Sequence, residues 1–403
     1  MNKYQATLFA NESDIYTALH SNKSKMAEGT LRKIAFDRGL IFPKKLERED
    51  LVEKISDLPF SYSHVEKIQK KLASNSSQEL FSVKRIFNNV KGFEDFNIDE
   101  LYDVLEIVKQ ERPPMLGSES IDHYAAPGMY VISIEYTEFD FKRSKFQQRK
   151  MYGGEIRFIV HADYISVRFT YTKRIKEILG KVIDKYQEKQ KCSLCIREID
   201  LSDIKDAMLR NAFAENMYDF DLRYTSKSGF IYSGLEKVRV SKISTILDQA
   251  SDIDLDDDSG EERDDFEKDA NADDKDNKTF IDNASYDGKS LVKTTQIEDL
   301  CQDGFYRSQI KWKSKATFLT GAPVITFELA FDEKYRAQDL KFKIISKETA
   351  GMPETREKLT DSDFDQVMSR LEEHIFMVND IIQSDHVKQF QSTTPEPDEQ
   401  EAS

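Results

Sequence analysis

Cations and aromatic rings are interleaved in one segment, and these residue types suit contact with nucleic acid. The cations are Lys142, Arg143, Lys145, Arg149 and Lys150, and the rings beside them are Phe141, Phe146 and Tyr152. Cationic side chains bind phosphate oxygens and rings stack on bases, so the mixture favours a surface that follows a single strand. The composition is equally typical of a solvated hairpin turn whose charges oppose edge pairing. The same pattern recurs, more briefly, at Lys311, Trp312, Lys313 and Lys315.

A second group of cations lies near the N-terminus: Arg32, Lys33, Arg38, Lys44, Lys45 and Arg48. The apolar residues around them predict two short helices, because Leu31 and Ala35 share one helical face and Leu51 and Ile55 share another. Gly39 follows the first helix, where a residue with positive φ is favoured. Residues 30–56 therefore predict a helix, an extended loop and a second helix, with cations near the helix ends and in the loop.

This pattern resembles the N-terminal domain of transcription termination factor Rho and the related SAP and LEM-like modules. The matching residues are Leu31, Ala35, Gly39, Leu40, Leu46, Asp50, Leu51, Val52 and Ile55. They span fewer than thirty of the 403 residues, so the rest of the chain is not covered. The resemblance implies contact with DNA or RNA through the six cations named above. LEM-like modules also bind proteins, so a protein partner remains an alternative.

Motifs of enzymatic chemistry are scarce. The sequence has no phosphate-binding glycine loop and no H-E-x-x-H zinc motif. Cys192 and Cys195 form a single C-x-x-C pair, which lacks the second pair of a zinc ribbon. A metal-dependent nuclease would draw on Glu135, Asp140, Glu155 and Arg157, but arginine is a poor substitute for a catalytic lysine. We therefore expect no cofactor and no metal, and the sequence identifies no catalytic residue.

The negative charge of the chain is concentrated in two segments. The net charge is −15 at pH 7, and residues 252–276 hold 14 acids and 3 bases. Four more acids follow Thr393, which leaves the rest of the chain near neutral. Residues 251–279 contain too few apolar side chains to form a core, so we predict that this segment is disordered.

The whole sequence is typical of a cytoplasmic protein. It lacks an apolar run of about 18 residues, so we expect no membrane span. The N-terminus lacks the basic and then apolar arrangement of a signal peptide. Three cysteines in 403 residues do not make a disulfide framework.

Hydrophobic periodicity predicts an α+β fold: a small all-α N-terminal head, then a mixed or antiparallel sheet body with packed helices and a disordered acidic insertion. The predicted divisions are a head at 1–60, a helical region at 61–113, an α+β body at 128–248, the acidic segment at 251–279, strands and a helix at 285–384 that complete the body, and an acidic tail at 385–403. Predicted helices are Glu12–Ser21, Ser63–Ala73, Gln78–Val90, Ile98–Lys109, 172–190, 200–217 and 362–382. Predicted strands are 129–141, 155–172 with a break near His161–Asp163, 230–232, 238–240, 306–312, 323–331 and 340–345, with a turn at Gly153 and Gly154.

These observations favour a non-enzymatic nucleic-acid-binding protein that contacts DNA or RNA through the helical head and the basic hairpin. One alternative is a protein-interaction adaptor or a subunit of a multi-protein bacterial system, with antiviral DNA defence as one such setting. Another is an enzyme acting on nucleic acid whose active site the sequence does not reveal.

Overall fold

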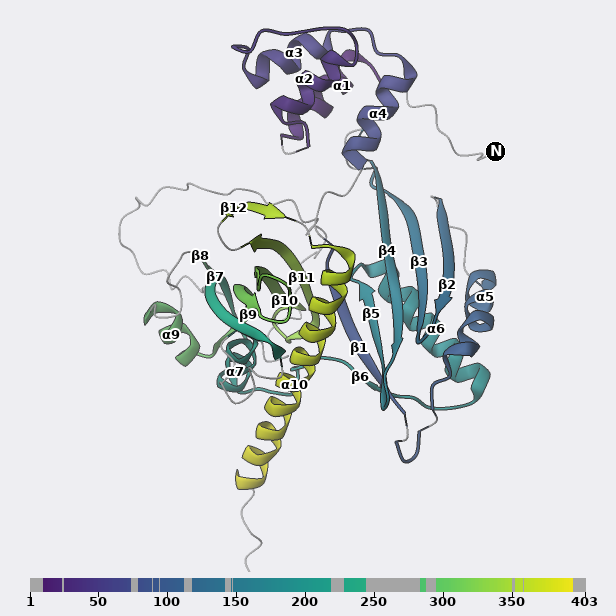
Figure 1. Ribbon diagram of the computed structural model, residues 1–403, viewed down its shortest axis with the longest axis vertical. Coiled ribbons are helices and arrows are strands. Elements are labelled where there is room, and N and C mark those ends of the chain that lie inside the picture. The colour runs from purple at the N-terminus through teal and green to yellow at the C-terminus, as the bar shows by residue number, and fades with distance from the viewer. Residues whose placement is uncertain are drawn as a thin grey trace, which may run out of the picture. The chain divides into compact units, whose positions relative to one another are not determined.

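The computed structural model describes residues 10–23, 25–73, 79–88, 90–93, 95–111, 118–141, 146, 148–218, 228–243, 283–287, 295–349, 352–357 and 359–393. The chain divides into two compact units, residues 1–198 and 199–403, which are described one at a time (Figure 1). Each unit combines antiparallel strands with helices, so the fold is α+β. The acidic segment at 251–279 lies outside the described residues.

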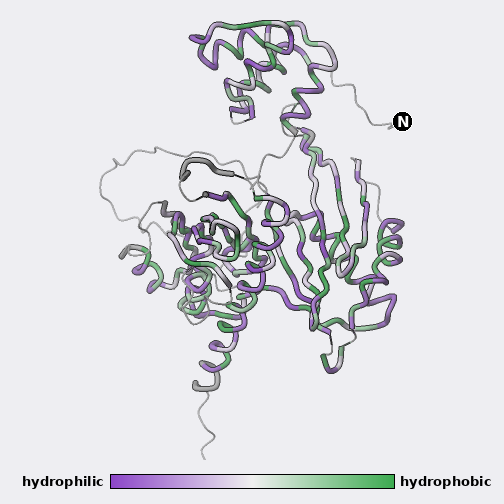
Figure 2. The backbone as a smooth tube through the Cα atoms, in the orientation of Figure 1, coloured by the Kyte–Doolittle hydropathy of each residue, from purple (hydrophilic) through white to green (hydrophobic). Residues whose placement is uncertain are grey.

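Four helices form the head of the first unit, residues 10–73. They are α1 (Glu12–Ser21), α2 (Glu28–Phe36), α3 (Arg48–Ser56) and α4 (Tyr62–Ala73). Their apolar residues, among them Leu19, Leu31 and Leu51, share one buried core, and hydrophilic and hydrophobic positions alternate along each helix (Figure 2). The side chain of Asn11 accepts a hydrogen bond from the Asp14 amide at 2.8 Å, and the Asp14 carboxylate accepts one from the Asn11 amide at 3.1 Å. This reciprocal cap starts α1 at the predicted residue.

The rest of the first unit is an antiparallel sheet with two helices. The described strands follow the order β2 (Glu119–Ala126), β3 (Met129–Phe139), β4 (Arg149–Val160), β5 (Tyr164–Thr170), β1 (Phe81–Phe87) and β6 (Cys195–Arg197). The helices are α5 (Leu101–Glu111), preceded by a 3₁₀ turn at Ile98–Glu100, and α6 (Lys173–Gln190). Strands β4 and β5 meet at residues 161–163, where the sequence predicts the break.

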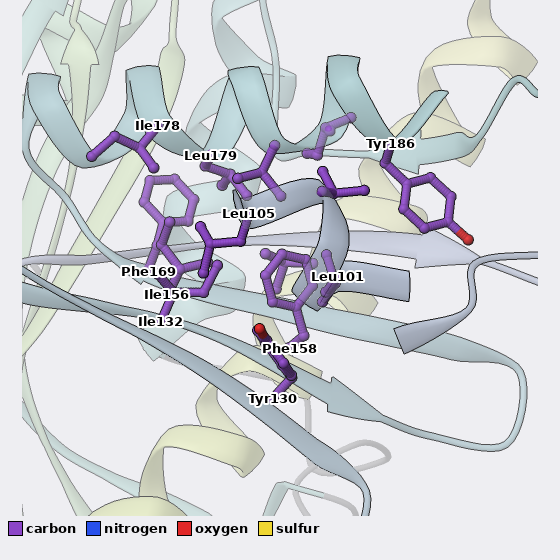
Figure 3. Close-up of a cluster of buried hydrophobic side chains, with 14 of the residues drawn as sticks. Leu101, Leu105, Tyr130, Ile132, Ile156, Phe158, Phe169, Ile178, Leu179 and Tyr186 are labelled. Carbon is purple, nitrogen blue, oxygen red and sulfur yellow. The ribbon is translucent and has the colours of Figure 1, made fainter. Parts of the chain in front are cut away.

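One face of this sheet is apolar and packs against α5 and α6. Ile132, Phe158 and Phe169 extend from the strands toward Leu105 and Leu179 of the helices (Figure 3). All five side chains are buried, and each contributes on the order of 1.5–3 kcal/mol by leaving water. Because side chains alternate along each strand, those of the other face of the sheet point away from this core.

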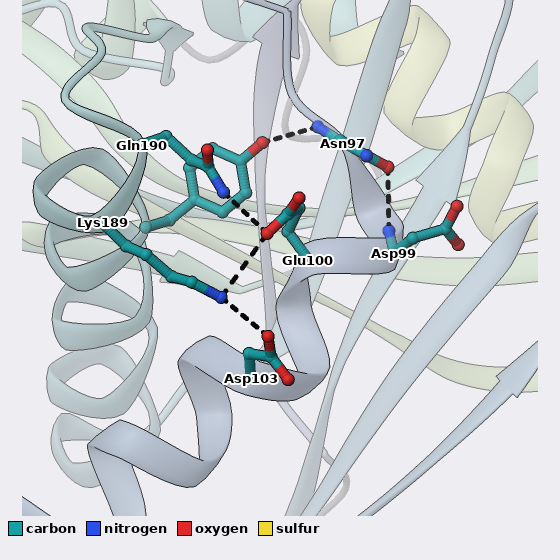
Figure 4. A network of polar contacts seen from close by, with 7 residues as sticks. Asn97, Asp99, Glu100, Asp103, Lys189 and Gln190 are labelled. Carbon is teal, nitrogen blue, oxygen red and sulfur yellow. Dashed lines mark hydrogen bonds and ion pairs between the residues drawn. The ribbon is translucent and has the colours of Figure 1, made fainter.

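Polar contacts join the last turn of α6 to the start of α5 (Figure 4). The Lys189 ammonium lies 2.9 Å from the Asp103 carboxylate and 3.5 Å from that of Glu100. The Asn97 amide donates a hydrogen bond of 2.7 Å to the hydroxyl of Tyr186, whose pKa is raised by burial. Since the lysine is exposed, the ion pairs align the two helices more than they stabilise them.

The segment Gln78–Val90 is not the predicted helix, because it contains strand β1. Val83 and Ile86 are three residues apart, a spacing that places two residues on one face of a helix. Along a strand, successive residues alternate between two faces, so residues three apart lie on opposite faces. Ile86 joins the apolar core, whereas Arg85 lies on the opposite face. Strand β1 pairs over its whole length with β5, about 80 residues later in the chain, and this long-range pairing overrides local spacing.

Two predicted boundaries also need correction. Strand β2 lies between the predicted helical region and the predicted body, and β1 lies in the same sheet as β3–β5, with α5 packed against it. The predicted body at 128–248 is divided after Glu198, where the second unit begins. Strand β2 pairs locally with the next strand, β3, whereas the placement of β1 depends on pairing with the distant strand β5.

Gly153 and Gly154 do not form the predicted turn, since both lie inside β4. A Cβ atom at Gly154 would lie 2.6 Å from Cδ1 of Ile175 and 2.6 Å from Cβ of Thr170. Glycine at this position thus allows α6 to approach the sheet closely. A Cβ atom at Gly153 would meet no atom within 4 Å.

We predict that Gly154→Ala lowers the free energy of unfolding by about 1–3 kcal/mol, because the added methyl group overpacks the contact with α6. Gly153→Ala is the matched control, and its effect should stay within about 0.5 kcal/mol. Urea unfolding of both variants measures the difference. Equal losses in the two variants would contradict the packing explanation.

The second unit is also an antiparallel sheet with helices. Its described strands follow the order β12 (Met352–Glu357), β11 (Gln338–Thr349), β10 (Val324–Glu333), β9 (Phe305–Ala316), β7 (Phe230–Lys242) and β8 (Asn283–Asp287). The helices are α7 (Ala207–Tyr218), α9 (Thr295–Gln302) and α10 (Asp361–Thr393). Strand β7 precedes the acidic segment and pairs with β8 and β9, which follow it. Helix α10 continues past the predicted end at Ile382 into the first part of the predicted acidic tail.

His374 of α10 is buried against α7. Its Nε2 atom lies 3.1 Å from the main-chain oxygen of Asn216 and donates a hydrogen bond there. Burial lowers the pKa of His374 from 6.5 to about 4, although this hydrogen bond opposes the shift. The imidazole is therefore neutral in the folded protein at pH 5, where the same side chain is largely protonated in an unfolded chain.

This shift predicts a pH dependence of stability. As pH falls from about 6.5 to 4, the unfolded chain takes up a proton that the folded chain does not, so His374 costs about 3 kcal/mol of stability over that interval. His374→Leu should remove this slope, while the titration of the carboxylates stays common to both proteins. Urea unfolding of wild type and variant at several pH values measures the difference, and parallel curves between pH 6.5 and 4 would contradict the assignment.

Candidate nucleic-acid interface

The loop between α2 and α3, residues 37–47, is closed at its start by main-chain geometry. Gly39 has φ of +78°, the left-handed conformation that its position after α2 predicts. The Gly39 amide donates a hydrogen bond to the Phe36 carbonyl at 2.8 Å, and the Leu40 amide donates one to the Ala35 carbonyl at 3.0 Å. The chain therefore turns back beside the end of α2.

Arg32 holds the remainder of this loop. Its guanidinium donates hydrogen bonds of 3.1–3.2 Å to four main-chain oxygens, those of Phe42, Pro43, Lys44 and Leu46. Its Nη2 atom also lies 2.8 Å from the Glu28 carboxylate, one turn earlier in α2. Arg32, which the sequence predicted to bind phosphate, thus donates its hydrogen bonds to the protein's own backbone.

Arg48 and Arg38 have similar structural contacts. Arg48 donates to the carbonyl oxygens of Leu19 at 2.7 Å, His20 at 3.2 Å and Met26 at 3.3 Å, and so joins α3 to the end of α1. Arg38 donates to the carbonyl of Pro59 and lies over the ring of Phe60, 4.4 Å from its centroid. Planar guanidinium groups suit both roles, because they combine several donors with a face that stacks.

The three lysines of the predicted set have a different environment. Lys33, Lys44 and Lys45 are exposed, and none has an ion-pair or hydrogen-bond partner for its ammonium group in the part of the head that the structure describes. Two apolar side chains near them in the chain are also exposed, Phe36 by 66% and Ile41 by 83%. The arginines fix the loop, and the lysines extend from it or from α2 into solvent.

The predicted basic hairpin between β3 and β4 is tested only in part. Lys142, Arg143, Lys145 and the side chain of Arg149 lie outside the described residues, and Lys150 is half-buried opposite Glu138 in the sheet register. Phe146 is 1% exposed and packs in the core of the head, so it is not the base-stacking ring that the sequence suggested. Tyr152 stacks on Tyr136, with ring centroids 5.1 Å apart.

The second basic segment is a strand and not a turn. Lys311 and Lys313 of β9 lie 3.1 and 2.9 Å from the carboxylate of Glu236, and Lys313 lies 2.9 Å from that of Glu348. Burial alone would raise the pKa of Glu236, but hydrogen bonds from the two lysines outweigh it and keep that pKa below its usual value. Trp312 points to the opposite face and is 2% exposed, so it is not a stacking ring, and Lys311 and Lys313 are neutralised by carboxylates. Lys315, the last cation of the segment, is exposed.

The candidate enzymatic residues do not converge on a site. Among the described residues, no group of three or more histidine, cysteine or acidic side chains is arranged to hold a metal. Neither Cys192 nor Cys195 forms a disulfide. The Glu155 carboxylate lies 2.8 Å from the Arg157 guanidinium, which explains the E-x-R spacing as an ion pair within β4.

The sequence analysis missed three arginines on the polar face of the first unit's sheet. Arg85, Arg168 and Arg197 lie on the same face as Arg157, the face opposite the apolar core. Strand alternation in residues 164–170 would have placed Arg168 there. Arg85 was hidden because its segment was predicted to be helical.

No protein-family model and no curated protein matches this chain. Within the described residues, every helix is too short or too polar to cross a membrane. The basis for a functional assignment is therefore the geometry of the chain itself.

Replacing Arg32 or Arg48 with Met should destabilise the head by about 1–3 kcal/mol each, because several partly buried carbonyl oxygens lose their donor. Lys44→Met and Lys45→Met are the controls, with expected effects within about 0.5 kcal/mol. Hydrogen–deuterium exchange of the head amides reports the local free energy of opening in the full chain. The structural role of the arginines is contradicted if the lysine variants open as readily as the arginine variants.

Proposed function

We propose that the protein binds nucleic acid, DNA or RNA, through the loop after α2 and the adjoining end of that helix. The observation that carries this proposal is the separation of the cations in the head. Arg32, Arg38 and Arg48 bind main-chain carbonyls, whereas the ammonium groups of Lys33, Lys44 and Lys45 are exposed and unpaired among the described residues.

A loop fixed from within is a good base for phosphate contacts. Because Arg32 binds the carbonyl of Lys44, the backbone from which this lysine extends is already ordered before a ligand arrives. Binding therefore does not have to offset the entropy cost of ordering the loop. The lysine side chains stay mobile, which suits contact with successive phosphates without sequence preference.

The total charge of the chain works against a polyanionic ligand at long range. With −15 overall, the protein does not steer nucleic acid from a distance. Binding must therefore rest on contacts within about one Debye length, roughly 10 Å at 0.1 M salt. Phe36 and Ile41 lie beside the lysines in the chain and offer apolar contact to bases or sugars, in addition to the ionic contacts.

A protein partner is the second candidate, and the same exposed apolar side chains favour it. Ile41 and Phe36 would be suitable anchors for an apolar contact surface. The two candidates differ in their response to salt, because phosphate contacts release counterions and apolar contacts do not.

The proposal predicts that changing Lys33, Lys44 and Lys45 together to Gln weakens binding of labelled DNA or RNA in fluorescence anisotropy. The slope of log affinity against log salt should become shallower by about two to three, one unit or slightly less for each lost phosphate contact. A matched variant changes Lys23, Lys54 and Lys67 to Gln, since these are exposed head lysines with the same total charge.

The control variant should keep the wild-type salt slope. Equal weakening in both variants would reduce the effect to net charge and contradict a local interface. Absence of nucleic-acid binding in the wild type would overturn the proposed function and leave the protein-partner candidate.

A further inference from the structure

Strand β2 is an edge strand of the first unit's sheet and runs beside α5 (Figure 1). Among the described strands it pairs only with β3, in a continuous register without a bulge. Sheets usually protect their edges with short strands, prolines, bulges or lysines. The strand β6 of the same unit has three residues, whereas β2 has eight and contains neither proline nor lysine. The edge of β2 therefore lacks the usual features that prevent pairing with a further strand.

The hydrogen bonds to β3 show which main-chain groups of β2 point outward. The Thr137 amide donates a hydrogen bond of 2.9 Å to the Ser118 carbonyl, so these two residues form a hydrogen-bonded pair. Such pairs alternate with non-hydrogen-bonded pairs along an antiparallel ladder. The amides and carbonyls of Ile121, His123 and Ala125 therefore point away from β3, and no described residue forms a hydrogen bond with them. They have the spacing that a further strand requires.

Aromatic rings line the side of β2 that faces α5. The ring centroid of His123 lies 5.1 Å from that of Tyr102 in α5 and 5.7 Å from that of Tyr130 in β3. Tyr102 is 52% exposed, so this aromatic group reaches the surface. The hydroxyl of Tyr130 is buried and has no hydrogen-bond partner among the described residues. An apolar side chain opposite His123 in an added strand would extend this group of rings.

The opposite side of β2 is acidic. Asp122 and Glu135 of β3 are exposed, and no described residue forms an ion pair with either carboxylate. They are diagonal neighbours, because the register partner of Asp122 is Ser133, two residues before Glu135. A residue opposite Asp122 in an added strand would form a non-hydrogen-bonded pair, in which the side chains approach most closely. A lysine or arginine at that position would therefore be within reach of the carboxylate.

We propose that the open edge of β2 binds an extended segment of a partner protein, with alternating basic and apolar residues, as a further antiparallel strand. Main-chain hydrogen bonds to Ile121, His123 and Ala125 supply affinity, and the side chains on the two faces supply selectivity. The apolar residues of the segment lie on the α5 side, and the basic residues lie beside Asp122. This surface is outside the head, so the inference does not depend on nucleic-acid binding.

Charge argues against two other occupants of this edge. If two copies of the chain paired antiparallel through β2, their acidic sides would lie on the same side of the joint sheet, and like charges on neighbouring strands destabilise a sheet. The segment 251–279 is a poor occupant for the same reason, since it is strongly acidic. A basic segment, in contrast, is attracted by Asp122 at short range and by the net charge of −15 at long range.

Fluorescence polarisation with a labelled peptide tests the inference in the full chain. The probe is a seven-residue peptide of alternating lysine and valine, and its control contains the same residues in block order. The alternating peptide should bind about tenfold more tightly than the control, because only alternation places the valines on one face and the lysines on the other. Equal affinities would reduce the binding to net charge and overturn the inference.

N-methylation of the probe tests the geometry of strand addition. A valine opposite His123 exchanges hydrogen bonds with β2, whereas the amides of the lysines point away from it. Methylation of the three valine amides should therefore weaken binding about tenfold or more, and methylation of three lysine amides should leave the affinity within about twofold. Equal losses, or no loss with either peptide, would contradict the added strand.

The variant Asp122→Lys tests the acidic side of the strand. It should weaken binding of the alternating peptide about threefold to tenfold, because a lysine of the peptide then lies opposite another lysine. Asp184→Lys is the matched control, since Asp184 is an exposed acid of α6 and the change in net charge is the same. The assignment of Asp122 is wrong if both variants lose the same affinity.

Hydrogen–deuterium exchange locates the bound peptide. The outward amides of residues 119–126 should exchange readily in the free chain and become protected when the peptide binds, while residues 36–45 of the head stay unchanged. If those outward amides are already protected without peptide, the edge is occupied by the chain itself or by a second copy, and the inference is overturned. The triple lysine variant of the head should bind the peptide at least as well as wild type, so failure of the proposed nucleic-acid function would leave this result intact.

Discussion

The guanidinium of Arg32 determines the shape of the loop on which the proposed function depends. It binds four carbonyl oxygens spread over residues 42–46 and an acid on its own helix. Few side chains can satisfy so many acceptors at once, because only arginine has five donors in one plane. With the loop held in this way, Pro43 and the neighbouring lysines remain at the surface and Leu46 packs toward the core of the head.

The environment of each cation, more than its position in a basic segment, decides what it does. Lys311 and Lys313 lie in a strand beside carboxylates that neutralise them, so they serve the second unit's sheet. Arg48 joins two helices through carbonyl groups. Lys44 and Lys45 have neither kind of partner among the described residues, and this difference is what makes them candidates for phosphate contact.

Local signals in the sequence predicted local structure well. The helix Glu12–Ser21 and the positive φ of Gly39 follow from capping and spacing within a few residues. Strand β1 could not be predicted from such local signals, since it forms by pairing with β5, far along the chain. The pair Gly153 and Gly154 predicted a turn, because the sequence does not reveal the close approach of Ile175 of α6 to Gly154, which is a tertiary contact. Arg32 and Lys33 are adjacent cations in the sequence, and their spacing does not reveal that Arg32 reaches Leu46, fourteen residues away.

Hydrogen–deuterium exchange of the full chain with and without a bound oligonucleotide tests the central claim most directly. If the head is the interface, amides of residues 36–45 become protected when nucleic acid binds, while the core of the head around Leu51 changes little. Binding that leaves the exchange of residues 36–45 unchanged would contradict the account of the head.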